Sequence, residues 1–259
     1  STVDVVDAEE GTVTESIPVG LEPIALALKP DKSELWVSNH VSDSVNVIDL
    51  DPSSPTFHQV VGLIDASSYQ EAGQYFDEPA GIAFASNAKA YVALSQENQI
   101  AVIDTARLEI TKTIAVPAQD PRAIAVFEDK LFVLPFESNN QTQLSGCLPS
   151  KIDGERCTFD AIEHVFTNNN VLSLNYVADI VKNPELPDRD LLVYDTGSEQ
   201  LIEIVEGLGT LLYGITVTES GQVVIAQTDA RNHTNGLAGP AGHGLAELES
   251  RPFLNPLSM

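Results

Sequence analysis

The sequence predicts an all-β fold, and within that class a β-propeller built from four-stranded antiparallel blades. Short runs of apolar, β-branched residues that end in aspartate recur along the chain, and such runs are typical of buried strands. Each run is followed by further strand-like segments in a fixed order, with a period of about 42 residues where nothing is inserted. The runs that end in aspartate are Val3–Asp7, Val45–Asp49, Ile100–Asp104 and Leu191–Asp195.

Three more segments complete each repeat. A turn of about five residues leads from the aspartate to a second strand, which is predicted at Val13–Val19, Phe57–Val61, Ile110–Val116 and Leu201–Val205. A strand of small apolar residues comes next, after Glu22-Pro, Glu78-Pro or Asp120-Pro in three copies and without proline at Leu212–Val217. A tight turn then leads to the last strand, at Leu35–Asn39, Ala90–Leu94, Leu131–Pro135 and Val223–Gln227.

The string from Ile17 to Asn39, followed by Val45–Asp49, resembles the YVTN β-propeller repeat. The Tyr-Val-Thr-Asn of that family stands here as Trp36-Val-Ser-Asn39, and in the second copy as Tyr91-Val-Ala-Leu94. The resemblance covers roughly two thirds of the chain, and its fourth copy is weak. It implies a seven-bladed propeller of the surface-layer type, located in the periplasm, secreted or at the cell surface.

The order of the strands raises a question of blade number. If the proline-preceded strand is the innermost strand a, the sequence begins at strand c and its last copy ends at strand b. The strands at 3–19 could pair with those at 212–228 and close a ring of four blades. The family resemblance favours the other interpretation, in which about four to five blades belong to a larger propeller. Residues 1–259 are therefore predicted as a single propeller domain or a propeller fragment.

Two insertions interrupt the repeats, at 62–79 and at 136–190, and an irregular Gly-rich tail covers 229–259. The first joins strand d to the next strand a and the second joins strands b and c, so both emerge on one rim. Loops carried by a rigid scaffold commonly hold binding sites. The predicted ligand-binding residues on this rim are Asn39, His40, Glu137, Asn139, Asn140, Asp229, Arg231 and His233.

Cofactor and redox predictions rest on the long insertion. Its polar stretches Ser138–Gln143 and Thr167–Asn170 offer oxygen atoms to Ca²⁺ or cap their own turns, and no other cofactor is evident. Cys147 and Cys157 are predicted to form a local disulfide, which indicates an oxidising compartment, although two reduced thiols are an alternative. The sequence has no CxxCH, GxSxG or HExxH motif, so no catalytic residue and no metal ligand is assigned.

Charge restricts the partners. The chain has 38 acidic and 13 basic residues and a formal net charge of −25, which excludes nucleic acid because phosphate binding needs clustered cations. No apolar run of about 18 residues is present, so no membrane span is predicted. The acidic surface serves solubility or attracts a cationic partner. A protein partner, or the remainder of the protein's own chain, is therefore expected.

Three functions fit these observations. The leading one is a non-enzymatic, extracytoplasmic binding or scaffold module, as part of a larger surface or redox protein. The second is a propeller enzyme, either a lactonase-like hydrolase or a quinone-dependent dehydrogenase, for which Glu137, Asp229, Arg231 and His233 are the candidates at the ring entrance. The third is an acidic electron-transfer partner of a lysine-rich cytochrome.

Overall fold

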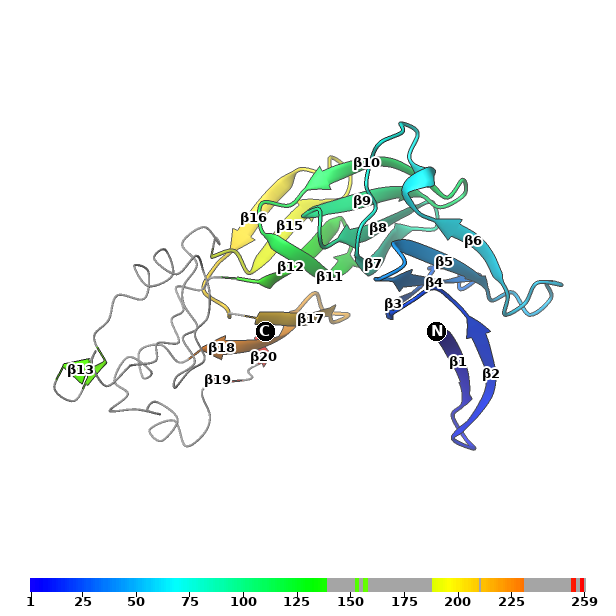
Figure 1. The fold of residues 1–259 in the computed structure, drawn as a ribbon, viewed down its shortest axis with the longest axis horizontal. Coiled ribbons are helices and arrows are strands. Elements are labelled where there is room, and N and C mark those ends of the chain that lie inside the picture. The colour runs from blue at the N-terminus through cyan, green and yellow to red at the C-terminus, as the bar shows by residue number, and fades with distance from the viewer. Residues whose placement is uncertain are drawn as a thin grey trace.

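The computed structural model describes residues 1–138, 188–209 and 211–230, and four two-residue strands beyond them. These short strands are β13 (Ile152–Asp153), β14 (Arg156–Cys157), β19 (Phe253–Leu254) and β20 (Leu257–Ser258). Antiparallel sheets stand side by side around a common centre and form an open arc (Figure 1). The fold is therefore a partial β-propeller. No helix in the described part of the chain is long and apolar enough to cross a membrane.

Three blades are complete, each with its strands in the order a to d from the inside outwards (Figure 1). Blade I consists of β3 (Pro23–Leu28), β4 (Glu34–Asn39), β5 (Ser44–Asp49) and β6 (Val60–Ile64). Blade II consists of β7 (Pro79–Ser86), β8 (Lys89–Leu94), β9 (Gln99–Asp104) and β10 (Glu109–Ala115). Blade III consists of β11 (Gln119–Phe127), β12 (Lys130–Glu137), β15 (Leu191–Asp195) and β16 (Leu201–Val205).

A half-blade lies at each end of the arc. The N-terminal half-blade consists of the outer strands β1 (Thr2–Asp7) and β2 (Thr12–Pro18), and the C-terminal half-blade of the inner strands β17 (Leu211–Val217) and β18 (Val223–Ala230). The described chain thus occupies five blade positions, within the predicted four to five. The alternative of a closed four-bladed ring is wrong for this structure, because β1 pairs with β2 alone and the outer edge of β18 is taken by β19 and β20.

One strand lies later in the sequence than predicted. The outer strand of blade I is Val60–Ile64 instead of Phe57–Val61. The preceding residues form turns, in which Asp49 accepts hydrogen bonds from the Asp51 amide at 2.9 Å and from the Thr56 hydroxyl at 2.7 Å. These bonds delay the start of the strand, so the connection to blade II runs from 65 to 78 and contains one short 3-10 helix, η1 (Ala66–Ser68).

The recurring aspartate at the end of each strand c caps the turn that follows it. Asp7 accepts hydrogen bonds from the amides of Glu9 and Glu10 at 2.8 and 2.9 Å, and Asp104 accepts one from the Ala106 amide at 2.9 Å. The bonds from Glu10 and Glu9 hold the pKa of Asp7 below its ordinary value. Such Asx-turns orient the chain for a hairpin, so these aspartates are structural and are not site candidates.

In each complete blade, a residue one or two positions before strand d has a left-handed backbone and contacts the preceding blade. We call these three residues, His58, Leu108 and Glu199, the latch residues, and their φ angles are 61°, 55° and 59°. His58 Nδ1 lies 2.6 Å from Glu15 Oε2 of the N-terminal half-blade. Leu108 packs against Gly62 of blade I, where a Cβ atom would collide with Leu108 Cδ1.

The third latch residue, Glu199, lies between two lysines of blade II. Its carboxylate is 2.7 Å from Lys89 Nζ and also contacts Lys112 Nζ, and its side chain is only 6% exposed. Burial alone raises the pKa of Glu199, but the hydrogen bonds from Lys112 and Lys89 hold it below its ordinary value. Blades II and III are therefore joined by a charged latch and not by apolar packing alone.

Apolar side chains fill the spaces between neighbouring blades. Trp36 is completely buried between blades I and II, and its ring meets Phe84 edge-on with 5.1 Å between centroids. Its indole Nε1 donates to Glu34 Oε2 at 2.9 Å, and the other oxygen of Glu34 is 2.9 Å from Lys29 Nζ. The polar edge of the indole is thus satisfied, as buried tryptophan requires.

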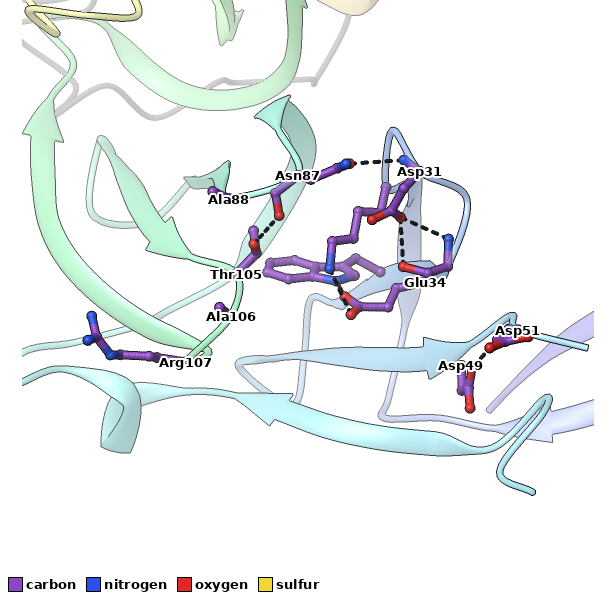
Figure 2. Close-up of polar contacts among 12 residues, drawn as sticks. Asp31, Glu34, Asp49, Asp51, Asn87, Ala88, Thr105, Ala106 and Arg107 are labelled. Atoms are coloured by element: carbon purple, nitrogen blue, oxygen red, sulfur yellow. Dashed lines mark hydrogen bonds and ion pairs between the residues drawn. The ribbon is translucent and has the colours of Figure 1, made fainter. Parts of the chain in front are cut away.

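A polar contact also joins the a–b turns of blades I and II. The Asn87 side chain accepts a hydrogen bond from the Asp31 amide at 2.9 Å, while the Asn87 carbonyl accepts one from the Thr105 hydroxyl (Figure 2). Turns of two blades are thereby tied together on the rim opposite the insertions.

Candidate functional site

The candidate site is the rim formed by the b–c turns and the d–a connections, which we call the b–c rim. The described residues on it are 39–44, 94–99, 137–138 and 188–190 from the b–c turns, and 19–22, 65–78, 116–120 and 206–209 from the d–a connections. Hydrogen bonds between these two kinds of loop fix the rim, so side chains that it carries are held on a rigid base.

A repeated hydrogen bond joins successive blades on this rim. Asp43 Oδ1 accepts from the Glu78 amide at 2.9 Å, and Asn98 Oδ1, one blade further, accepts from the Asp120 amide at 2.7 Å. All four residues have positive φ, between 47° and 56°. Asp and Asn tolerate this region, but a residue before proline is normally extended. The bond therefore helps to hold Glu78 and Asp120 in a strained conformation at the entrance to each inner strand.

Carboxylates gather where blades I and II meet on the rim. Asp43, Asp77 and Glu78 are close together, and burial, followed by the charges of Asp43 and Glu78, raises the pKa of Asp77 above its ordinary value. His40 Nε2 lies 3.9 Å from Glu78 Oε2, and the Ser95 hydroxyl donates to the same oxygen at 3.2 Å. Burial and the two neighbouring carboxylates thus both make ionisation of Asp77 less favourable than in water.

The predicted residues Asn39 and His40 occupy different environments. Asn39 is completely buried and donates to Asn46 Oδ1 at 2.9 Å and to Ser44 Oγ at 3.3 Å. These hydrogen bonds stabilise the b–c hairpin of blade I on its buried side. His40 is half-buried at the surface beside Glu78, and its amide donates to the Glu22 carbonyl at 2.9 Å. Of the two, His40 is therefore the one placed to meet a ligand.

Glu137 and Asp229 are far apart in the sequence but lie on strands β12 and β18, which flank β17. Glu137 at the end of β12 is the register partner of Leu211, which is also the partner of Thr228, the neighbour of Asp229. They lie two blades away from His40. The predicted residues Asn139, Asn140, Arg231 and His233 lie outside the described residues, as does Cys147, and only the backbone of Cys157 is described, in β14.

Three residues at the same place were not found from the sequence: Arg122, Phe136 and Tyr213. Arg122 forms a two-pronged ion pair with Asp120, with both N–O distances 2.8 Å, and its guanidinium lies 4.4 Å from the centre of the Phe136 ring. Tyr213 meets Phe136 edge-on at 5.4 Å and is 55% exposed. One signal in the sequence could have pointed to this cluster. Arg122 follows the proline of its copy, whereas the apolar residues Ile24 and Ala80 stand at that position in the other two proline-containing copies.

Asp190, at the start of β15, holds the last d–a connection. It is completely buried, and its Oδ2 accepts from the Leu208 amide at 2.6 Å. Burial raises the pKa of this carboxyl above its ordinary value, and hydrogen bonds from Ser138 and Leu208 offset this only in part. The folded protein thus stabilises the ionised form of this carboxyl less well than water does.

We expect Asp190→Asn to stabilise the protein at neutral pH by about 1 to 2 kcal/mol, because it keeps an acceptor for Leu208 and removes a buried charge. A group whose folded pKa is raised contributes stability below its unfolded pKa and loses it as pH rises through the folded value. The gain should therefore be present at pH 7 and absent at pH 3 in urea unfolding. Asp188→Asn, at a half-buried neighbour, is the control, and a gain that is equal at both pH values would contradict the assignment.

Basic residues are distributed unequally between the two rims. All described lysines except Lys112 lie at the a–b rim, on or beside the a–b turns: Lys29, Lys32, Lys89 and Lys130. The described arginines of the b–c rim are Arg122, which pairs with Asp120, and Arg189, which contacts the Pro117 carbonyl. The carboxylates there include Glu22, Asp43, Asp65, Glu71, Asp77, Glu78, Glu97, Asp120, Asp188, Asp190 and Glu206. Carboxylates also lie at the a–b rim, among them Asp31, Glu34, Asp104 and Glu219, but lysines stand among them. The b–c rim is therefore strongly acidic.

Metal binding and cavities give weaker indications of a functional site. Among the described side chains, no three His, Cys, Asp or Glu residues are arranged to hold a metal ion, so Ca²⁺ stays a prediction that concerns the insertion.

A groove of about 350 Å³ lies outside blades I and II. Burial of Tyr69 in this region, together with the charges of Glu97 and Asp77, raises the pKa of its hydroxyl to about 12. The groove is lined by residues that include Leu63, Ser67, Tyr69, Arg107 and Leu108.

Solved structures with the same fold are β-propellers. Hydrazine synthase of Kuenenia stuttgartiensis matches 90% of this chain and 51% of its own, with 22% identity and a TM-score of 0.58. The WD40 β-propeller domain of Doa1 matches 86% of this chain and 53% of its own, with 7% identity and a TM-score of 0.53. A chain of the mitotic checkpoint complex matches 87% of this chain and 51% of its own, with 9% identity and a TM-score of 0.54.

These likenesses define the class of protein, a β-propeller, and at such identities they concern the fold alone. The chain spans about half the length of the propellers that it matches. No protein-family model and no curated protein matches the sequence.

Proposed function

We propose that this chain is the propeller part of an extracytoplasmic binding module, and that its b–c rim binds a protein partner with a cationic surface. The observation that carries the proposal is the scarcity of cations beside the carboxylates of the b–c rim: its described arginines are Arg122 and Arg189, whereas lysines stand among the carboxylates of the a–b rim. Complementary potentials steer partners together and fix their orientation. The extracytoplasmic location is supported by the resemblance to YVTN propellers and by the expected disulfide.

Uncompensated charge distinguishes a binding rim from a merely soluble surface. At the junction of blades I and II, the pKa of Asp77 is raised by burial and by two further carboxylates. Holding like charges together costs free energy, which a cationic partner would recover on binding. The alternative of an electron-transfer partner for a basic cytochrome uses the same rim, because it too requires an acidic docking surface. The two differ in whether the partner must carry haem.

The test removes three charges from the rim without removing its hydrogen bonds, in the variant D43N/D77N/E78Q. Asn98 already occupies the position equivalent to Asp43 in blade II and accepts the same bond, so Asp43→Asn preserves the rim. The probes are a lysine-rich peptide and a basic cytochrome c, with binding followed by fluorescence anisotropy at two salt concentrations. We expect the Kd to rise about tenfold at low salt and its salt dependence to weaken.

The matched control, E9Q/E10Q/E219Q, changes the net charge equally, at exposed residues of the opposite rim. Its affinity should change less than about twofold. Equal losses in both variants, or no saturable binding of either probe, would overturn the proposal. Binding of the cytochrome but not of the peptide would favour the electron-transfer alternative.

A further inference from the structure

The N-terminal half-blade lacks its two inner strands. Strand β1 occupies position c, but among the described strands it pairs with β2 alone, whereas β5, β9 and β15 each pair with a strand on both sides. Its inner edge therefore presents unpaired backbone groups. Free edges of this kind are normally covered or paired in folded proteins.

The inner strand of blade I is exposed on the side where those strands would lie. Leu26 is 58% exposed, but Ile82 and Ile124, at the same position of blades II and III, are each only 8% exposed. The difference arises because each of these isoleucines is covered by the preceding blade. Blade I covers Ile82, and blade II covers Ile124. Ile24 and Leu28 on the same face of β3 are likewise 45% and 48% exposed.

This exposed face continues an interface that already exists. Further out, Ile17 of the half-blade packs with Val37 and Ile48 of blade I, and Leu35 packs against the same cluster. The apolar surface then runs inwards onto β3, where it is uncovered. Whatever covers it must extend the half-blade sheet from the edge of β1 towards the centre of the arc.

We propose that β1 and the face of β3 receive an a–b hairpin of this same repeat, supplied by further polypeptide of the same protein. An antiparallel hairpin pairs its strand b with β1 and lays the apolar side chains of its two strands over Ile24, Leu26 and Leu28. This chain covers only 51 to 53% of the hydrazine synthase, Doa1 and mitotic checkpoint chains that it matches, which leaves room for such a hairpin.

A second copy of the chain fits less well as the source. The inner hairpin outside the complete blades is β17–β18, and it already packs on blade III and carries β20 at its outer edge, where β1 would have to pair. Strand β20 would have to leave that edge before β1 of a second copy could pair with β18 and complete its half-blade. The occupant is therefore assigned to the protein's own polypeptide.

The experiment compares Leu26→Ala in the 259-residue chain and in the complete gene product. In the 259-residue chain the Tm should stay within about 1 °C, because Leu26 is exposed. In the complete product the Tm should fall by about 4 °C or more, as it should for Ile82→Ala in either protein. Leu63→Ala, at an exposed position of β6, is the control and should be neutral in both. Hydrogen exchange of the β1 amides should slow in the complete product.

Three results would overturn the proposal. The first is a gene product whose intact mass corresponds to these 259 residues alone. The second is a neutral effect of Leu26→Ala in both proteins. The third is a dimer of the 259-residue chain that Leu26→Ala dissociates, since a second copy would then be the occupant.

Discussion

Replacing Trp36 by alanine is expected to lower the free energy of unfolding by about 3 to 5 kcal/mol. The ring is completely buried between blades I and II and meets Phe84 edge-on. The substitution opens a cavity at this interface and leaves Glu34 without its indole donor. Trp36→Phe keeps most of the packing and should cost about 1 to 2 kcal/mol, chiefly for that hydrogen bond.

The measurement is urea unfolding followed by circular dichroism, because the sequence contains one tryptophan and the variants lose its fluorescence. Tyr75→Ala is the control, since Tyr75 is 67% exposed and its ring should contribute less than about 0.5 kcal/mol. An effect of Trp36→Ala no larger than that of the control would show that blades I and II are not held by this contact.

Replacing Glu199 by alanine is expected to cost about 2 kcal/mol. Loss of one member of a fully buried ion pair typically costs about 3 to 5 kcal/mol. The value is lower here because the side chain of Lys112 is 53% exposed and water can solvate it. Lys89, which is less exposed, retains hydrogen bonds to the Thr196 carbonyl but loses its counter-charge.

The same carboxylate predicts how stability depends on pH. The pKa of Glu199 lies below its ordinary value of 4.5 in the folded protein. Its contribution is thus present above pH 4.5 and is lost as pH falls through the folded pKa. Glu199→Gln should therefore unfold at lower urea concentration than the wild type at pH 7, and the difference should shrink towards pH 3. Glu203→Gln, at an exposed position of β16, should show no such trend.

The strand order was predictable from the sequence because the repeated pattern of apolar residues, aspartate and proline marks each strand and its turn. The blade positions and the half-blades follow from it, whereas the capping role of the recurring aspartates is seen only in the structure. The position of β6 could not be predicted from this pattern. Hydrogen bonds from Asp51 and Thr56 to Asp49 lengthen a turn whose composition resembles that of a strand from Phe57 onwards.

The candidate site was predictable only at the level of the rim. Connections of two kinds meet there as a consequence of topology, and His40 and Glu137 lie at such connections, while their role as ligand-binding residues stays a prediction. The cluster of Arg122, Phe136 and Tyr213 combines side chains of blade III and of the C-terminal half-blade. Such contacts between residues far apart in the sequence cannot be predicted from a local pattern. Nor does the sequence show that Asn39 faces inwards, because its burial is set by Ser44 and Asn46 across the hairpin.

The latch residues have a consequence for folding fidelity. Repeats that resemble one another risk docking in the wrong order while the chain collapses. Here each junction uses a different chemistry: an imidazole–carboxylate contact at His58, a leucine seated on glycine at Leu108, and a carboxylate between two lysines at Glu199. A blade that docks beside the wrong neighbour would place charge against an apolar surface or leave it unpaired. Successive blades thus recognise their correct neighbours although their backbones are nearly interchangeable.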